Sequence, residues 1–223
     1  MVGASSRLWL DRRPGAHGAR MPVPEIILAS ASPRRAALLA QVGLPFRVLH
    51  STLDEDATWP PALGEDHEGR ACRLALAKAQ HVAARVMVGL VIGADTIVVC
   101  DGIAYGKPRD ASEAHDILTR LAGRTHQVIT AVAVVEAETG RVEIATSVTV
   151  VWMLPFELRE VAAYVATGEP LDKAGAYAIQ GRGALLVERI EGEYSTVVGL
   201  SLPTLARLLR CFGVDIWQAI RHS

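Results

Sequence analysis

The segment from Val91 to Cys100 constrains the fold most, because it is almost continuously apolar. Such a run predicts a buried strand. Asp95 and Thr96 interrupt it, and a carboxylate is costly to bury unless a cation or a metal pairs with it. Asp95 could be a strand-end residue bonded to backbone amides. We favour a functional role for Asp95, because a charge without a function would be costly to bury in a strand this apolar. Asp95 would then ligate Mg²⁺ or activate a water.

The rest of the chain mixes strand and helix patterns around this segment. Turn signals at Asp101-Gly102, Glu138-Thr139-Gly140 and Glu191-Gly192 predict hairpins. A glycine-rich irregular stretch is expected at 169–183. Strands are expected at 26–29, 46–49, 125–136 and 141–152, and helices at 33–42, 66–88, 110–122, 157–167 and from about 201. This order predicts an α/β fold with a mixed sheet and flanking helices, in one compact domain with two lobes.

Composition narrows the functional class. Half of the 223 residues are hydrophobic, and 23 Lys+Arg against 24 Asp+Glu leave a net charge of −1. A strongly basic nucleic-acid binder would look different, so no stable nucleic-acid partner is expected, and any bound anion must meet a local cluster of cations. No apolar run is long enough to cross a membrane. Cys72, Cys100 and Cys211 show no paired spacing, which favours a reducing, cytoplasmic setting.

The N-terminal arm differs from the rest of the chain. Residues 1–24 are expected to be a disordered extension ahead of a domain at 25–215, with a C-terminal tail at 216–223. The arm holds Arg7, Arg12, Arg13 and Arg20 against Asp11 alone. A transit-like or nucleic-acid-touching arm and a start at Met21 are the alternatives.

The sequence Ser32-Pro33-Arg34-Arg35 lies at a predicted strand-to-helix turn. Ser32 suits the N-cap and Pro33 the first helical position. A helix N-terminus offers free N–H groups and a positive dipole end, and the two arginines add planar donor forks for phosphate oxygens. The turn therefore predicts an anion site. The alternative is plain capping with two solvated arginines.

Several further residues are candidates for the same site. Lys78, in an alanine-rich helical face, and Lys107, on a turn, could each neutralise a polyphosphate or be ordinary surface lysines. Glu55 lies in an acidic loop that is either functional or simply solvated. Gln180 could contact a base edge, because its amide both donates and accepts. No P-loop, H-E-x-x-H or G-x-S-x-G motif is present.

Five motifs occur together, in order, over about residues 25–215. Their combination resembles the Maf family of nucleotide pyrophosphatases, whereas no one of them would be specific alone. The motifs are Ala29-Ser30-Ala31-Ser32-Pro33-Arg34-Arg35, Gly93-Ala94-Asp95-Thr96, Gly106-Lys107-Pro108, Thr130-Ala131-Val132 and Asp172-Lys173-Ala174-Gly175. The resemblance implies a Maf-like fold, related to that of inosine triphosphate pyrophosphatases, with two lobes around a central cleft and cleavage between the α- and β-phosphates.

The resemblance also implies roles for single residues. Asp95 looks like the catalytic base, and Asp95 with Glu55 is expected to hold a divalent cation, Mg²⁺ or alternatively Mn²⁺. The substrate is expected to contact a further set of side chains. Arg34, Thr96 and Gln180 look like the positions that set substrate choice, and Asp172 and Lys173 look like pocket residues. Arg35, Glu55, Lys78 and Lys107 resemble the polar shell around phosphates and metal, and Glu55, Lys78 and Lys107 are expected to be catalytic with Asp95. Ser32 is expected to bind the substrate with its hydroxyl at the strand-to-helix turn.

The sequence from Asp172 to Gly181 also indicates which substrate is used. Family members that act on dTTP and UTP typically read Asp-Lys-Ala-Gly-Ala-Tyr followed by Ile-Gln-Gly, as this chain does. The expected activity is therefore hydrolysis of dTTP and UTP, with modified pyrimidine nucleotides as further substrates. The alternatives are a pyrophosphatase for 7-methyl-GTP or another non-standard purine nucleotide, and a nucleotide-binding regulator of cell division. A homodimer is expected from the family alone.

Overall fold

A seven-stranded mixed sheet organises the computed structural model, which describes residues 24–53 and 62–220. The strand order is β2-β1-β3-β5-β6-β7, and β4 pairs with one end of β3. β1 pairs in parallel with β2 and β3, and the other pairs are antiparallel. The predicted mixed sheet is confirmed. The strands are β1 (Ile26–Leu28), β2 (Arg47–Val48), β3 (Leu90–Cys100), β4 (Ile103–Tyr105), β5 (Thr125–Glu136), β6 (Val142–Met153) and β7 (Val187–Glu191).

The helices begin where the sequence supplies caps. Asp66, Asp110 and Ser201 each accept a hydrogen bond from a backbone N–H of the first turn that follows. The helices are α1 (Pro33–Gln41), α3 (His67–Ala83), α4 (Ala111–Leu121), α5 (Leu158–Val165), α6 (Tyr194–Val198), α7 (Leu202–Cys211) and α8 (Ile216–Ala219), with 3₁₀ turns η1 (Glu169–Asp172), η2 (Ala174–Ala176) and η3 (Gly181–Leu186).

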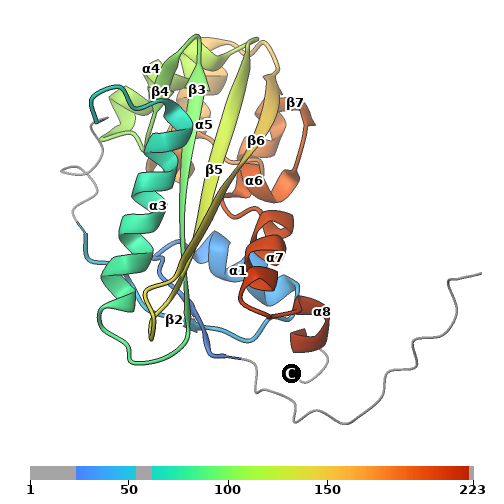
Figure 1. Ribbon diagram of the computed structural model, residues 1–223. Helices are drawn as coiled ribbons and strands as arrows, with labels where there is room; N and C mark the ends of the chain where they lie inside the picture. The colour runs from blue at the N-terminus through green and yellow to red at the C-terminus, as the bar shows by residue number, and fades with distance from the viewer. Residues whose placement is uncertain (1–23, 54–61, 221–223) are drawn as a thin grey trace, which may run out of the picture.

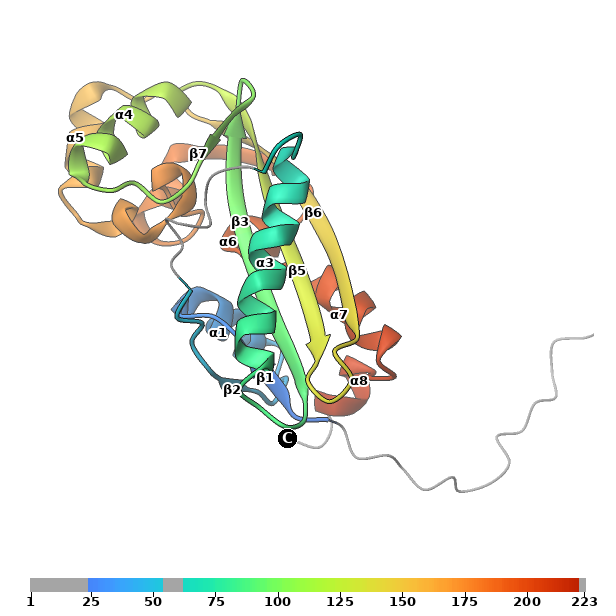
Figure 2. The same cartoon turned by 60° about the vertical axis from the view of Figure 1, so that its left-hand side comes forward.

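The helices cover the sheet on both faces and at one end. α3 lies along one face, and α1, α7 and α8 lie against the other (Figure 1). α4, α5 and the 3₁₀ turns gather at the end where β4 leaves β3, and form a second lobe away from α1 (Figure 2). Three apolar clusters match this layout: one under α7 around Leu205, one under α3 around Leu74, and one beneath α4 around Leu118.

β3 runs through both lobes. Leu90 and Ile92 belong to the core under α7, whereas Val98 and Cys100 belong to the core beneath α4. Asp95 and Thr96 therefore lie at the junction of the two lobes.

The sheet is interrupted beside this junction. The β1–β3 ladder ends at Leu28 opposite Ile92, and the β3–β4 ladder begins only at Val98 opposite Tyr105. Between Ile92 and Val98, β3 pairs with β5 on one side, and no strand within 24–53 or 62–220 pairs with its other edge. This break leaves room for a cleft.

Three expectations differ from the structure, and the predicted extension falls mostly outside it. The helix expected at 66–88 ends at Ala83. No second strand follows Glu191: β7 pairs with β6, and Gly192 leads into α6 instead of a hairpin. The segment 216–223, expected as a tail, contains α8, whose first residue Ile216 packs on the core under α7 together with Ile220, which follows the helix. Apart from Pro24, the predicted extension lies outside the described residues. No helix in the described ranges is long and apolar enough to span a membrane.

Candidate active site

α3 lies unusually close to β3. A Cβ atom built on Gly93 would lie 2.2 Å from the carbonyl oxygen of Ala75 and 2.8 Å from the backbone nitrogen of Ala79. Only glycine allows this approach. Lys78, one residue before Ala79, consequently reaches over the strand to Asp95.

Asp95 and Lys78 form a buried ion pair. Lys78 Nζ lies 2.7 Å from Asp95 Oδ1, and the two side chains are 10% and 9% exposed. The other carboxylate oxygen, Asp95 Oδ2, is buried and accepts no hydrogen bond from the described part of the chain. A buried acceptor of this kind needs a partner, so Oδ2 is suited to a metal ion or to a water that gives up a proton.

The N-terminus of α1 contributes Arg35 to the opposite side of β3. Arg35 donates to the carbonyl oxygen of Gly199 at 2.7 Å and to the hydroxyls of Ser30 and Thr96 at 3.3 Å each. Ser32 occupies the predicted N-cap position, but its side chain makes no capping bond, and its N–H donates to Ser30 Oγ. The hydroxyl of Ser32 is thus not committed to the helix.

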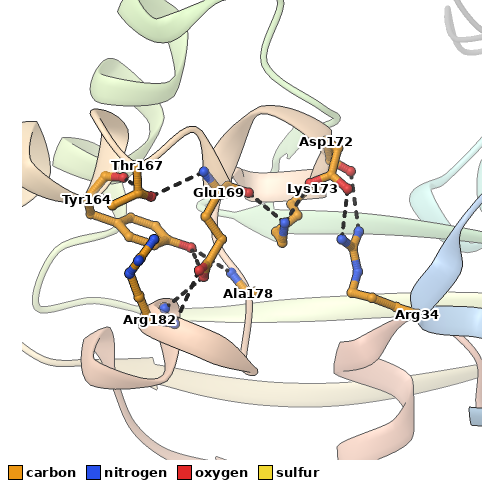
Figure 3. Close-up of polar contacts among 9 residues, drawn as sticks. Arg34, Tyr164, Thr167, Glu169, Asp172, Lys173, Ala178 and Arg182 are labelled. Carbon is orange, nitrogen blue, oxygen red and sulfur yellow. Dashed lines mark hydrogen bonds and ion pairs between the residues drawn. The ribbon is translucent and has the colours of Figure 1, made fainter. Parts of the chain in front are cut away.

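Arg34 connects α1 with the second lobe. It donates from Nη1 to Asp172 Oδ2 at 2.9 Å and from Nη2 to the Asp172 carbonyl oxygen at 3.3 Å (Figure 3). Lys173 also pairs with the Asp172 carboxylate. Burial opposes the ionisation of Asp172, but the hydrogen bonds from Lys173 and Arg34 outweigh it, so the pKa of this carboxyl lies below its ordinary value.

Glu169 organises the glycine-rich stretch that was expected to be irregular. Its carboxylate accepts from Tyr164 Oη at 3.0 Å and from the N–H groups of Arg182 and Gly183, at 3.2 Å and 2.9 Å (Figure 3). Burial raises the pKa of Glu169, but these donors outweigh it and the net shift is downward. No motif in the sequence assigns a role to Glu169. Its position just after a helix-ending glycine was the available signal.

These elements enclose one cleft of about 540 Å³ at the break in the sheet. Every predicted site residue that the structure describes lines it. Lys107 and Gln180 are exposed at its wall, and Glu55 lies outside the described residues. The predicted residues along the cleft are Ser32, Arg34, Arg35, Lys78, Asp95, Thr96, Lys107, Asp172, Lys173 and Gln180.

The charges in the cleft favour a polyanion. Arginine and lysine side chains come from α1, α3, the segment after β4, and η1–η2, whereas Asp95 is the buried carboxylate. Arginine forks and lysine ammonium groups are the usual partners of phosphate oxygens. The fold and the cleft thus define an α/β protein that can hold a polyphosphate beside a buried carboxylate.

The chain belongs to the Maf-like protein family, whose model matches residues 25–212. This confirms the resemblance drawn from the five motifs. A protein named dTTP/UTP pyrophosphatase from Moorella thermoacetica is 52% identical over 88% of this chain and 99% of its own. A protein of the same name from Symbiobacterium thermophilum is 48% identical over 86% of this chain and 96% of its own.

A solved structure of a HAM1 protein from Coxiella burnetii aligns with 59% of this chain and 73% of its own, at 18% identity and a TM-score of 0.40. So weak a likeness adds nothing to the fold assignment, which rests on the sheet and helices described above.

Proposed function

We propose that this protein hydrolyses dTTP and UTP to the nucleoside monophosphate and pyrophosphate. The observation that carries the proposal is the buried Asp95, set among cations at the break in the sheet, whose Oδ2 accepts no hydrogen bond from residues 24–53 or 62–220. Relatives about half identical to the chain carry the name dTTP/UTP pyrophosphatase. They match nearly their whole length, which supports transferring the activity of the whole protein.

Asp95 is proposed as the general base. A water attacks the α-phosphorus, its proton passes to Asp95 Oδ2, and the bond from the α-phosphorus to the bridging oxygen breaks to release pyrophosphate. Lys78 holds the other oxygen, Oδ1, at 2.7 Å, so only Oδ2 needs to face the water. A positioned general base contributes about 10²–10⁴-fold to the rate.

A divalent cation, Mg²⁺ or alternatively Mn²⁺, is proposed as the cofactor. When bound, it would polarise the phosphate oxygens. Asp95 would help to hold the cation through a water, because its Oδ2, which is buried and lacks a hydrogen-bond partner in the described ranges, is the atom proposed to take the proton. The same ranges contain no group of three or more His, Cys, Asp or Glu side chains that could hold a metal. Mg²⁺ commonly uses one or two carboxylates together with substrate phosphates, so Asp95 and Glu55 are proposed to hold the ion.

The basic residues are proposed to neutralise the triphosphate. Arg35, Lys78 and Lys107 would offset the charge that grows on the leaving pyrophosphate, which lowers the barrier if the contacts strengthen in the transition state. Arg34 and Gln180 would contribute to substrate choice. Because Asp172 pairs with Arg34, a phosphate would have to compete for that guanidinium.

The test is pyrophosphate release from dTTP, UTP, 7-methyl-GTP and ITP with Mg²⁺, comparing the wild type with Asp95→Asn. We expect turnover of dTTP and UTP and a loss of about 10²–10⁴-fold in the variant. Glu143→Gln is the matched control and should keep full activity, because Glu143 lies on β6, pairs with Arg141 and does not line the cleft. Preference for a purine substrate would overturn the proposed substrate, and an active Asp95→Asn would overturn the proposed base.

We also propose a cytoplasmic location and a homodimer. Cys72, Cys100 and Cys211 are all free thiols, which suits a reducing compartment. The homodimer rests on the family resemblance. Light scattering on the eluted peak from size exclusion would give the mass, and a monomer across the working concentration range would refute the dimer.

A further inference from the structure

Thr130 lies behind the cleft and is fully buried on β5. It stands directly opposite Thr96 in the β3–β5 ladder, and the two Oγ1 atoms are 2.9 Å apart. Thr130 Oγ1 also lies 2.8 Å from the backbone carbonyl oxygen of Thr196 in α6. That carbonyl is not used at the helix end, because the N–H of Leu200 bonds to Ser195. Thr130 therefore joins Thr96 to α6.

The direction of the two hydrogen bonds follows from counting protons. A threonine hydroxyl has one proton to donate and two lone pairs to accept. A carbonyl oxygen can only accept, so the proton of Thr130 goes to Thr196. The Thr96–Thr130 contact can then be a hydrogen bond only if Thr96 donates. The single hydroxyl proton of Thr96 is thereby committed to the interior of the protein.

Toward the cleft, Thr96 consequently offers lone pairs alone. One accepts from Arg35 Nη2 at 3.3 Å. The side chain is partly exposed and lines the cleft, so the oxygen can accept once more. A phosphate oxygen placed against it would set acceptor against acceptor. A group with a proton to donate is the matching partner.

We propose that Thr130 is a positioning residue that fixes the Thr96 hydroxyl as a hydrogen-bond acceptor, so that Thr96 selects a donor group on the bound nucleoside. The donor is either a sugar hydroxyl or the ring N–H at position 3 of the pyrimidine. This rests on the proposed function for the identity of the ligand. It assigns Thr96 to the nucleoside and leaves the phosphates to the cationic side chains.

Binding measurements separate the two donors. The probe is 2′-deoxyuridine 5′-(α,β-imido)triphosphate, in which a P–N–P link replaces the scissile bridge. The 2′-deoxycytidine analogue replaces the ring N–H by a lone pair, and the 3′-fluoro analogue replaces the sugar hydroxyl by a group that cannot donate. Dissociation constants are measured by calorimetry for wild type, Thr130→Ser, Thr130→Val and Thr96→Val. Thermal unfolding checks that each variant is folded.

We expect one of the two swaps to weaken wild-type binding about tenfold, the size of one lost hydrogen bond that leaves an unpaired acceptor. Thr130→Ser keeps the hydroxyl and should discriminate equally. Thr130→Val frees the Thr96 proton, so its discrimination should fall toward unity, as it should in Thr96→Val. If Thr130→Val does not fold, Thr130→Ala, which also removes the hydroxyl that holds the Thr96 proton, takes its place.

Two results would overturn the inference. One is wild-type binding that neither analogue weakens; the other is discrimination that persists in either of the two valine variants. Turnover of dTTP, measured separately, decides the proposed function. A protein that binds and discriminates without turnover would lose the proposed activity and keep this assignment, whereas a folded protein that binds no nucleotide would lose both.

Discussion

Lys78 Nζ and Asp95 Oδ1 lie 2.7 Å apart in the interior, on a helix and a strand that touch at Gly93. Neither charge is well solvated. The pair therefore links the stability of the fold to the group proposed to carry the chemistry.

Removing Lys78 should destabilise the protein strongly. Lys78→Met leaves the Asp95 carboxylate buried without its ammonium partner, and breaking such a pair costs about 3–5 kcal/mol. The double variant Lys78→Met/Asp95→Asn should recover part of this loss, because the uncompensated charge is gone. Urea unfolding monitored by circular dichroism measures both. A cost below about 1 kcal/mol for Lys78→Met would place the pair among solvated surface pairs.

Gly93 should not tolerate a side chain. In Gly93→Ala the new methyl group would meet the backbone of α3 at 2.2 Å, so helix and strand must separate and Lys78 must draw away from Asp95. Overpacking of this kind costs about 1–3 kcal/mol or more, and activity should fall with it. Gly140→Ala is the comparison: its φ is 73° but no atom lies within 4 Å, so only backbone strain of about 1–2 kcal/mol is expected. Equal activity in both variants would show that the close approach of α3 to β3 at Gly93 is not required.

His126 should make the protein lose stability in mild acid. Burial lowers the pKa of this histidine from 6.5 to about 4, and its Nε2 lies 2.8 Å from Tyr177 Oη. The unfolded chain takes up the proton first, so the stability from the neutral ring is complete above pH 6.5. It falls between pH 6.5 and about 4, by at most about 1.4 kcal/mol per pH unit.

Unfolding free energies of wild type and His126→Gln at pH 7.5, 6.0 and 5.0 test this. The variant should be less stable at pH 7.5 and show a flatter dependence on pH over this range. Parallel curves for the two proteins would rule out the histidine as the source of the slope.

Glu169 should hold the loop that carries Asp172 and Lys173. Glu169→Gln replaces a charged acceptor of three hydrogen bonds by an amide, at a cost of about 1–3 kcal/mol at neutral pH. The carboxyl has a lowered pKa, so its contribution is present above the ordinary value of 4.5 and is lost as the pH falls below it. We expect weaker nucleotide binding, read as a higher KM. An unchanged KM with lowered stability would limit Glu169 to a structural role.

The sequence allowed much of the architecture to be predicted, because its periodicities are strong. The apolar run now seen as β3 and the capped helices α3 and α4 lie close to their expected positions. The predicted hairpin at Glu191-Gly192 is wrong because of contacts with a strand that is distant in the sequence. Gly192 packs against Thr149 of β6, and Glu193 exchanges hydrogen bonds with the Thr149 hydroxyl, so the turn ends the sheet instead of adding a strand to it.

The residues of the candidate site could be predicted from the sequence, but the contacts that position them could not. Lys78 could have been an ordinary surface lysine by pattern alone, and its burial depends on how closely α3 approaches β3. Thr130 belonged to a motif of the family resemblance but received no role, because the Thr196 carbonyl that orients it is 66 residues away along the chain. Such long-range contacts have no local sequence signal. The proposed roles of the site residues stay predictions until the variants are measured.

The break in the sheet between β1 and β4 also limits how the protein can move. The two lobes flank one strand whose ladder with β5 is unbroken from Leu90 to Val99. Because a hinge rotation of the lobes would bend that ladder, we expect the lobes to keep their relative position when a ligand binds. We expect the ligand to be enclosed by short-range rearrangement around it, chiefly the exchange of Arg34 from Asp172 to the incoming anion. Such a site would bind its ligand without a large-scale closure. The strands stay rigid and a few charged side chains move.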